Sequence, residues 1–103
     1  MNNCIFTCYL AEEPILDQVD GVSYLDLKLV VYNYRKTKHS GEKSRTPVYI
    51  YCEAWHTGAE TIASLAEEGT QITVNATAKN VKDEEDLIIF RINEFDLPCL
   101  DND

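Results

Sequence analysis

The sequence predicts a small all-β domain with one helix. Three segments in the first half alternate apolar and polar residues with a period of two, the pattern of strands that bury one face. A later segment over residues 57–69 has the period of a helix, and two more alternating segments follow it. The chain has 103 residues, 45% of them hydrophobic, with only four glycines and three prolines. We therefore expect one domain with one core over residues 1–98, followed by a short acidic tail at 99–103.

The first strand is predicted over Cys4 to Leu10, and it ends before the turn Glu12-Glu13-Pro14 because proline disfavours regular structure there. Residues 15–19 are expected to form a short connector or edge segment, with a turn following at Asp20-Gly21. The longest strand is predicted from Val22 to about Tyr34. Leucines at alternate positions face one side of this strand, and tyrosines face the other.

The stretch from Val48 to Trp55 is the strand on which the functional interpretation rests. Its alternation places two sets of side chains on opposite faces, namely Val48, Ile50, Cys52 and Ala54 on one and Tyr49, Tyr51, Glu53 and Trp55 on the other. Aromatic rings with polar groups suit the stacking of planar ligands, and they equally suit packing at a sheet or subunit interface. From this stretch alone both interpretations stay open.

The helix is expected to run from Thr57 to Gly69. Thr57 and Glu60 have the spacing of a capping box, and Gly69 stands where a helix end favours a positive φ. Glu67 and Glu68 would then lie in the last turn, where they oppose the helix dipole. The predicted apolar stripe comprises Ala59, Ile62, Leu65 and Ala66.

Two final strands are predicted over Thr70 to about Lys79 and over Leu87 to Leu97. The first points Ile72, Val74 and Ala76 inward, and the second gathers Ile88, Phe90 and Ile92 on one side. Between them, the acidic turn from Asp83 to Asp86 is expected to be exposed, because four adjacent carboxylates repel one another.

Charge is distributed unevenly along the chain. The net charge is −9, yet residues 35–45 carry +4, because they contain five basic residues and only Glu42 opposes them. The rest of the chain therefore carries −13, a balance that taken alone argues against a polyanionic partner. We expect the basic segment from Arg35 to Thr46 to form an exposed, mobile loop that joins the two tyrosine-bearing strands.

The cysteines and histidines do not indicate a metal site or a cofactor. Four cysteines occur without any C-x-x-C pair, so reduced thiols in the core are favoured over a four-cysteine metal site. His39 and His56 do not combine with them at a zinc-ligand spacing. No apolar run reaches the length of a membrane span and no signal peptide is evident, so we expect a cytoplasmic protein, bacterial, phage or organelle-related, with no membrane partner.

The order strand, strand, strand, helix, strand, strand is that of an OB-fold, a five-stranded and partly open barrel, although other small β-barrels fit the same order and length. In an OB-fold the second and third strands form a ligand face, and here those strands carry the tyrosines and flank the basic loop. Aromatic stacking contributes roughly 1–3 kcal/mol per base, and lysine or arginine neutralises phosphate. The sequence thus predicts binding of single-stranded nucleic acid on this face.

From about Cys4 to Leu97 the chain resembles the bacterial single-stranded DNA-binding protein family. The segments that carry the resemblance are Leu10 to Pro14, Tyr24 to Leu29, Gly41-Glu42 in the basic loop, Tyr49 and Trp55 six residues apart, and Thr57 to Gly69. The resemblance implies an OB-fold that binds single-stranded DNA, assembles as a homotetramer or dimer, and has replication proteins as further partners.

The sequence departs from the family pattern in four respects. A family stacking aromatic aligns near Arg35, so Tyr34 would substitute for it, and another aligns near Asp83, where the contact is lost. The family's glycine-rich linker and its acidic tail with an apolar end are missing from this sequence, so a diverged, tail-less member is expected. Glu53 and the turn from Asp83 to Asp86 would repel phosphate.

We therefore predict a non-enzymatic, sequence-nonspecific single-stranded DNA-binding protein of replication, recombination or repair. The bases would stack on Tyr34, Tyr49, Tyr51 and Trp55, and the phosphates would contact Arg35, Lys36, Lys38, Lys43, Arg45 and Lys79. The alternative is an OB-fold protein-interaction module, similar to primosomal accessory proteins, whose aromatic face is an interface and which the overall charge favours. An enzyme is disfavoured because neither histidine has a matching nucleophile motif and no phosphate-binding glycine loop occurs.

Overall fold

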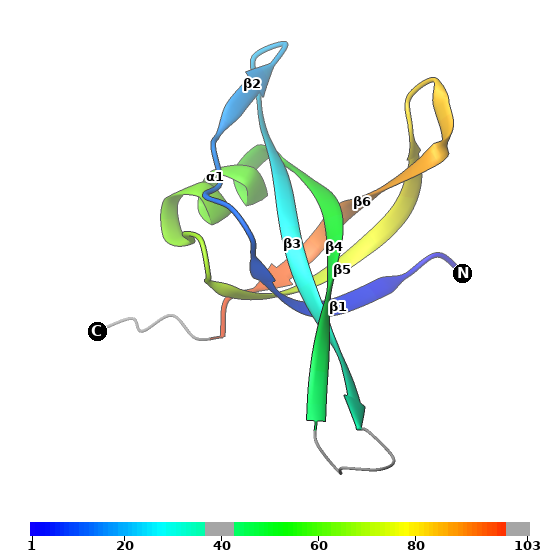
Figure 1. Ribbon diagram of the computed structural model, residues 1–103. Helices are drawn as coiled ribbons and strands as arrows, with labels where there is room; N and C mark the ends of the chain where they lie inside the picture. Colours follow the sequence, from blue (N-terminus) through cyan, green and yellow to red (C-terminus); the bar gives the residue numbers. More distant parts are fainter. Residues whose placement is uncertain (37–42, 99–103) are drawn as a thin grey trace.

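The computed structural model describes residues 1–36 and 43–98 (Figure 1). It contains six strands and one helix. In chain order they are β1 (Cys4–Leu10), β2 (Asp17–Val19), β3 (Val22–Lys36), β4 (Lys43–Trp55), α1 (His56–Leu65), β5 (Gln71–Val81) and β6 (Glu84–Asp96). The short connector predicted over residues 15–19 therefore contains an edge strand, β2, which pairs only with β3.

Five of the strands close into a barrel. Their order in the sheet is β1-β5-β6-β4-β3, and a further pairing of β1 with β3 completes the ring. The all-β class and the five-stranded barrel with one helix between its third and fourth long strands, as in an OB-fold, are confirmed. Two of the pairings that close the ring are short, because β1–β3 and β4–β6 each contain only two register pairs.

The core consists of the inward-facing residues that the alternation predicts. The fully buried strand residues include Leu25, Leu29, Cys52, Ile72 and Val74. Ile62 of α1 is also fully buried and belongs to the same cluster. Burial raises the pKa of the Cys8 thiol to about 11, and burial together with Cys8 raises that of Cys52 to about 12. These free thiols therefore stay protonated near neutral pH and pack as small apolar side chains, as the sequence predicts.

The predicted loop from Arg35 to Thr46 is wrong at both ends, and its middle, residues 37–42, lies outside the described residues. β3 extends to Lys36 and β4 starts at Lys43, so Arg35 and Arg45 are strand residues of one long, projecting hairpin (Figure 1). The two strands pair without interruption from Tyr24 with Trp55 to Lys36 with Lys43. The antiparallel register continues to the pair of Lys36 with Lys43, so the basic composition of this segment did not prevent strand formation. The predicted site residue Lys38 lies outside the described residues.

The helix is shorter than predicted, and it starts differently. It covers His56–Leu65, Trp55 is its N-cap residue, and among the described residues no side chain supplies the cap hydrogen bond, so the predicted capping box of Thr57 and Glu60 is wrong. Leu65 is 54% exposed, whereas Ala59, Ile62 and the following Ala66 are buried and Ala63 packs against the core. His56 has a φ of 58°, the left-handed region that disfavours residues with a Cβ atom.

The residues after α1 form a tight turn to β5 and do not extend the helix. Gly69 has the expected positive φ, of 90°, but it uses this conformation in the turn, where its amide donates to the Leu10 carbonyl at 2.8 Å. Glu67 and Glu68 lie beyond the helix end and therefore do not oppose its dipole as predicted. The Glu68 amide instead donates to a carboxylate oxygen of Glu13 at 2.9 Å.

The acidic turn is also shorter than predicted. Only Lys82 and Asp83 form the turn, with a φ of 65° at Asp83, and the three acidic residues that follow begin β6. All of them are exposed, in agreement with the sequence. Ile88 is 59% exposed because it lies on the projecting part of this hairpin, whereas Phe90 and Ile92 pack against the core (Figure 1).

Candidate nucleic-acid interface

The outer face of the β3–β4 hairpin carries the residues that the sequence singles out. Pairing places Tyr24 opposite Trp55, Asp26 opposite Glu53, and Lys28 opposite Tyr51. Farther toward the hairpin tip, Val30 lies opposite Tyr49, Tyr32 opposite Pro47, and Tyr34 opposite Arg45. One continuous face thus has a half rich in tyrosine and basic residues near the tip, and a half with two carboxylates at the other end.

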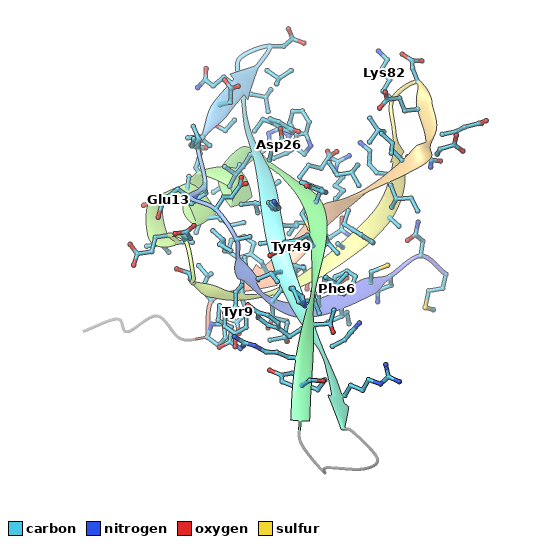
Figure 2. The ribbon with its side chains drawn as sticks, viewed as in Figure 1. Phe6, Tyr9, Glu13, Asp26, Tyr49 and Lys82 are labelled. Carbon is cyan, nitrogen blue, oxygen red and sulfur yellow. The ribbon has the colours of Figure 1, made fainter. Side chains whose placement is uncertain are left out.

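We call the hollow in the tip half the tyrosine hollow. It has a volume of about 630 Å³. β1 contributes Tyr9 and Leu10, β3 contributes Lys28, Val30 and Tyr32, and β4 contributes Arg45 and Tyr49. Ala11, Glu68 and Gly69 line the side beyond β1. Figure 2 shows Tyr9 and Tyr49 closer to the hairpin tip than Asp26 is. The hollow exists because β1 pairs with β3 at Tyr9 and Val30, which brings a ring from the first strand onto the hairpin face.

Cations and rings alternate inside the tyrosine hollow. The Lys28 ammonium lies 4.8 Å from the centre of the Tyr49 ring, and the Arg45 guanidinium lies 4.1 Å from the centre of the Tyr32 ring. Tyr9 and Tyr32 are in tilted contact, with 6.1 Å between ring centres. Val30 beneath them is only 6% exposed, so the floor is apolar. Such contacts orient each cation beside a ring and leave the ring's other face for a planar ligand.

The hollow also contains carboxylates, which limit where an anion can lie. Lys28 is 3.8 Å from a carboxylate oxygen of Glu12, a partly exposed pair that contributes little to stability. Glu68 lines the hollow on the side of β1, whereas Arg45 lines it on the side of β4. Charge therefore favours an anion on the β4 side of the hollow, near Arg45, over the side of Glu68.

We call the other half the Glu53 cluster, which comprises Tyr24, Asp26, Glu53, Trp55 and Lys79. Glu53 is only 5% exposed, and its carboxylate lies 3.1 Å from the Lys79 ammonium. The Trp55 indole N–H donates to the same carboxylate, and the Trp55 ring packs against Tyr24 with 4.5 Å between ring centres. The Tyr24 hydroxyl donates to Asp26, and burial and this carboxylate raise the pKa of Tyr24 well above its ordinary value.

The structure separates the predicted stacking residues into two groups. Tyr49 lines the tyrosine hollow, and Tyr34 lies beside it opposite Arg45, with 52% and 72% of their surfaces exposed. Tyr51 is 55% exposed and lines a neighbouring groove of about 400 Å³ with Lys28, Asp26, Glu12 and Ile89. Trp55 is partly buried in the Glu53 cluster and lies outside the hollow.

The predicted phosphate contacts divide in the same way. Arg45 lines the hollow. Arg35 is exposed, but it alternates with Tyr34 along β3 and so points to the opposite face of the hairpin, and its carbonyl accepts from the Ser44 hydroxyl at 3.4 Å. Lys36 and Lys43 are register partners at the end of the paired strands. Lys79 is on β5 and ion-paired to Glu53, so it does not join the other basic residues.

Three aromatic or basic residues that line the hollow were not among the predicted contacts, namely Tyr9, Lys28 and Tyr32. Lys28 and Tyr32 could have been found, because the alternation already places them on the same face as Tyr34. No local sequence pattern indicated Tyr9, because its position depends on the pairing of β1 with β3.

Among the described residues, no group of three or more His, Cys, Asp or Glu side chains could hold a metal ion, and α1 is too short to cross a membrane.

Comparison with known proteins gives matches in structure but not in sequence. No protein-family model and no curated protein sequence matches the chain. Among solved structures, the second single-stranded DNA-binding protein (SSBb) of Mycobacterium smegmatis is similar with a TM-score of 0.77 at 8% identity, over 99% of this chain and 96% of that one. The single-stranded DNA-binding protein of Thermus aquaticus gives 0.75 at 21% identity, over 99% of this chain and 51% of that one.

A third similar structure is PriB of Ralstonia solanacearum, with a TM-score of 0.71 at 13% identity over 94% of this chain and 97% of that one. The chain has the fold of these proteins. The resemblance to bacterial single-stranded DNA-binding proteins is thereby confirmed in the fold. The chain spans about half the length of the Thermus protein and matches nearly the full length of the other two.

Proposed function

We propose that the protein binds single-stranded DNA without sequence preference, with bases stacked in the tyrosine hollow and phosphates neutralised by the basic hairpin. The observation that carries the proposal is the alternation of Lys28, Tyr49, Arg45 and Tyr32 over an apolar floor. Every base has a flat face, so stacking requires no base-specific hydrogen bond. The fold shared with two proteins named for single-stranded DNA binding supports the proposal.

The test is the affinity for a fluorescently labelled oligo(dT), followed by anisotropy between about 50 mM and 200 mM salt. We expect Tyr49→Ala to weaken binding about tenfold or more, because a stacked base contributes roughly 1–3 kcal/mol. Leu87→Ala is the matched control, since Leu87 has nearly the same exposed fraction, 51% against 52% for Tyr49, but lies on the acidic hairpin. Absence of binding by the unmodified protein, or unchanged affinity in Tyr49→Ala, would contradict the proposal.

We also propose that the protein self-associates through the outer face of β1 and β5. In a chain with 26% charged residues, the middle of this face carries uncharged outward side chains, namely Ile5, Thr7, Thr73, Asn75 and Thr77, whereas the charged Lys79 lies toward the far end of β5. Ile5 is 64% exposed, and the Thr7 and Thr73 hydroxyls meet at 3.2 Å in the middle of this face. An uncharged sheet surface of this kind suits packing against a second copy.

This face also supports the second candidate function, a protein-interaction module. Thr73→Arg places a charge at the centre of the face and should lower the mass measured by light scattering, whereas Gln18→Arg on β2 should not. If Thr73→Arg dissociates the protein while the unmodified protein fails to bind oligo(dT), the interaction module is favoured. A role in replication, recombination or repair, a non-enzymatic function and a cytoplasmic location stay predictions.

A further inference from the structure

The Glu53 cluster lies over one of the two short pairings that close the barrel. β4 and β6 share only the register pairs of Cys52 with Phe90 and Glu53 with Arg91, so few backbone hydrogen bonds hold the strands together there. The ion pair from Glu53 on β4 to Lys79 on β5 passes across β6, which lies between these two strands in the sheet. Side chains of the cluster therefore connect the strands where backbone pairing is shortest.

Trp55 is part of this connection. Its indole N–H donates to Glu53, and one side of its ring is covered by Tyr24. A buried carboxylate requires hydrogen-bond partners, and here Lys79 and the indole supply them. If a base drew the indole away, the Glu53 carboxylate would lose a donor in a site that is only 5% exposed.

The charges around Trp55 do not attract a phosphate. Asp26 lies opposite Glu53 across the hairpin, and Lys79 and Arg91 lie on the other side of Glu53. Two carboxylates therefore face two cations, with no net attraction for an anion. The tip half differs, because Lys28 and Arg45 lie beside rings in the tyrosine hollow and the Arg45 guanidinium has no carboxylate partner among the ion pairs of the described residues.

The tyrosine hollow leads away from Trp55. From Arg45 and Tyr49 on β4 it crosses β3 at Val30 and β1 at Tyr9, and it ends at Gly69 in the turn before β5. Its rings are accessible, as Tyr49 and Tyr9 are 52% and 38% exposed. A strand that follows these rings crosses the hairpin toward the Gly69 turn and does not run along β4.

We propose that single-stranded DNA crosses this face through the tyrosine hollow toward Gly69 and does not contact Trp55, whose indole instead holds Glu53 at the β4–β6 pairing. This inference rests on the proposed function. It reverses the role that the sequence predicts for Trp55, and it makes Tyr9 a contact residue.

The chain contains one tryptophan, so its fluorescence reports on this position alone. We would titrate the unmodified protein with labelled oligo(dT), and record oligonucleotide anisotropy and tryptophan emission in the same samples. The expected result is a saturating rise in anisotropy with unchanged emission. Tyr49→Trp is the matched positive control, because it places a second indole in the hollow and should lose that indole's emission as the complex forms.

Each outcome separates this inference from the proposed function. Emission of the unmodified protein that falls in step with anisotropy, as in Tyr49→Trp, shows that Trp55 stacks and overturns the inference alone. An anisotropy that never rises overturns the proposed function, and the inference with it. As a second arm, Tyr9→Ala should weaken binding about as much as Tyr49→Ala does, and full affinity in Tyr9→Ala would overturn the proposed path.

Discussion

The two short pairings that close the barrel differ in the side chains on their outer faces. At β1–β3, the outer face stays open as the tyrosine hollow, with Lys28 and Arg45 beside exposed rings. At β4–β6, similar residue types contact one another, so that Trp55, Lys79 and Glu53 satisfy each other's polar groups. Aromatic and basic residues on a strand face are thus available to a ligand only where no buried carboxylate occupies them.

The largest effect that separates the two pairings is expected from Lys79→Ala. This variant removes the cation that pairs with the Glu53 carboxylate, and the Glu53 side chain is only 7% exposed. We therefore expect the free energy of unfolding to fall by about 2–4 kcal/mol. The estimate is at the lower end for a broken buried pair because Lys79 is itself 43% exposed. Urea unfolding measures it, with Lys82→Ala as the control, since Lys82 lies exposed in the turn that follows β5.

Lys79→Ala also tests the predicted role of Lys79 as a phosphate contact. If the Glu53 cluster is structural, folded Lys79→Ala should bind oligo(dT) with unchanged affinity and unchanged salt dependence. A drop in affinity without a drop in stability would reverse the distinction between the two halves and restore Lys79 to the binding surface.

A smaller effect is expected from replacing Arg45 of the tyrosine hollow, with Arg91 beside the Glu53 cluster as the comparison. Arg45→Ala removes a cation over Tyr32, so we expect affinity for oligo(dT) to fall about fivefold, from a loss of about 1 kcal/mol. The slope of log affinity against log salt should become shallower by about 0.7, the value for one phosphate contact on a single strand. Arg91→Ala, opposite Glu53, should change neither quantity. Equal losses in both variants would mean that the DNA crosses both halves.

The smallest effect concerns the end of β4, where Trp55 passes into α1 through His56. Because His56 has a φ of 58°, glycine at this position should raise the free energy of unfolding by about 0.5–1 kcal/mol. Thr57→Gly, one residue farther into the helix, should lower it by a similar amount. Thermal unfolding distinguishes them, and a destabilised His56→Gly would show that the imidazole makes a contact worth more than the backbone strain.

The sequence predicts most of the fold because the alternation of apolar and polar residues along each strand decides which face of that strand is buried. Leu25, Cys52 and Ile72 follow that period without exception and are fully buried. It does not decide where strands end, so the hairpin containing Arg35 and Arg45 was predicted as a loop from its composition. Local spacing likewise suggested a cap at Thr57, which the chain replaces with an extended Trp55.

The candidate site was predictable only in part, because outward-facing residues acquire their roles from partners on other strands. Tyr49 and Arg45 could be selected from the alternation and the charge. Glu53 also faces outward, yet it is buried by Lys79, a residue 26 positions away on β5 that no local pattern connects to it. The same applies to Tyr9, which reaches the site through the pairing of β1 with β3.

The short pairings at β1–β3 and β4–β6 have a consequence for folding kinetics. The β3–β4 hairpin contains 13 register pairs between strands that follow each other in the chain, whereas each short pairing joins strands farther apart in sequence through only two register pairs. Because distant contacts cost more loop-closure entropy, we expect the hairpin to form early and both pairings to close after the transition state. Weakening the Glu53 cluster should then accelerate unfolding while refolding keeps its rate.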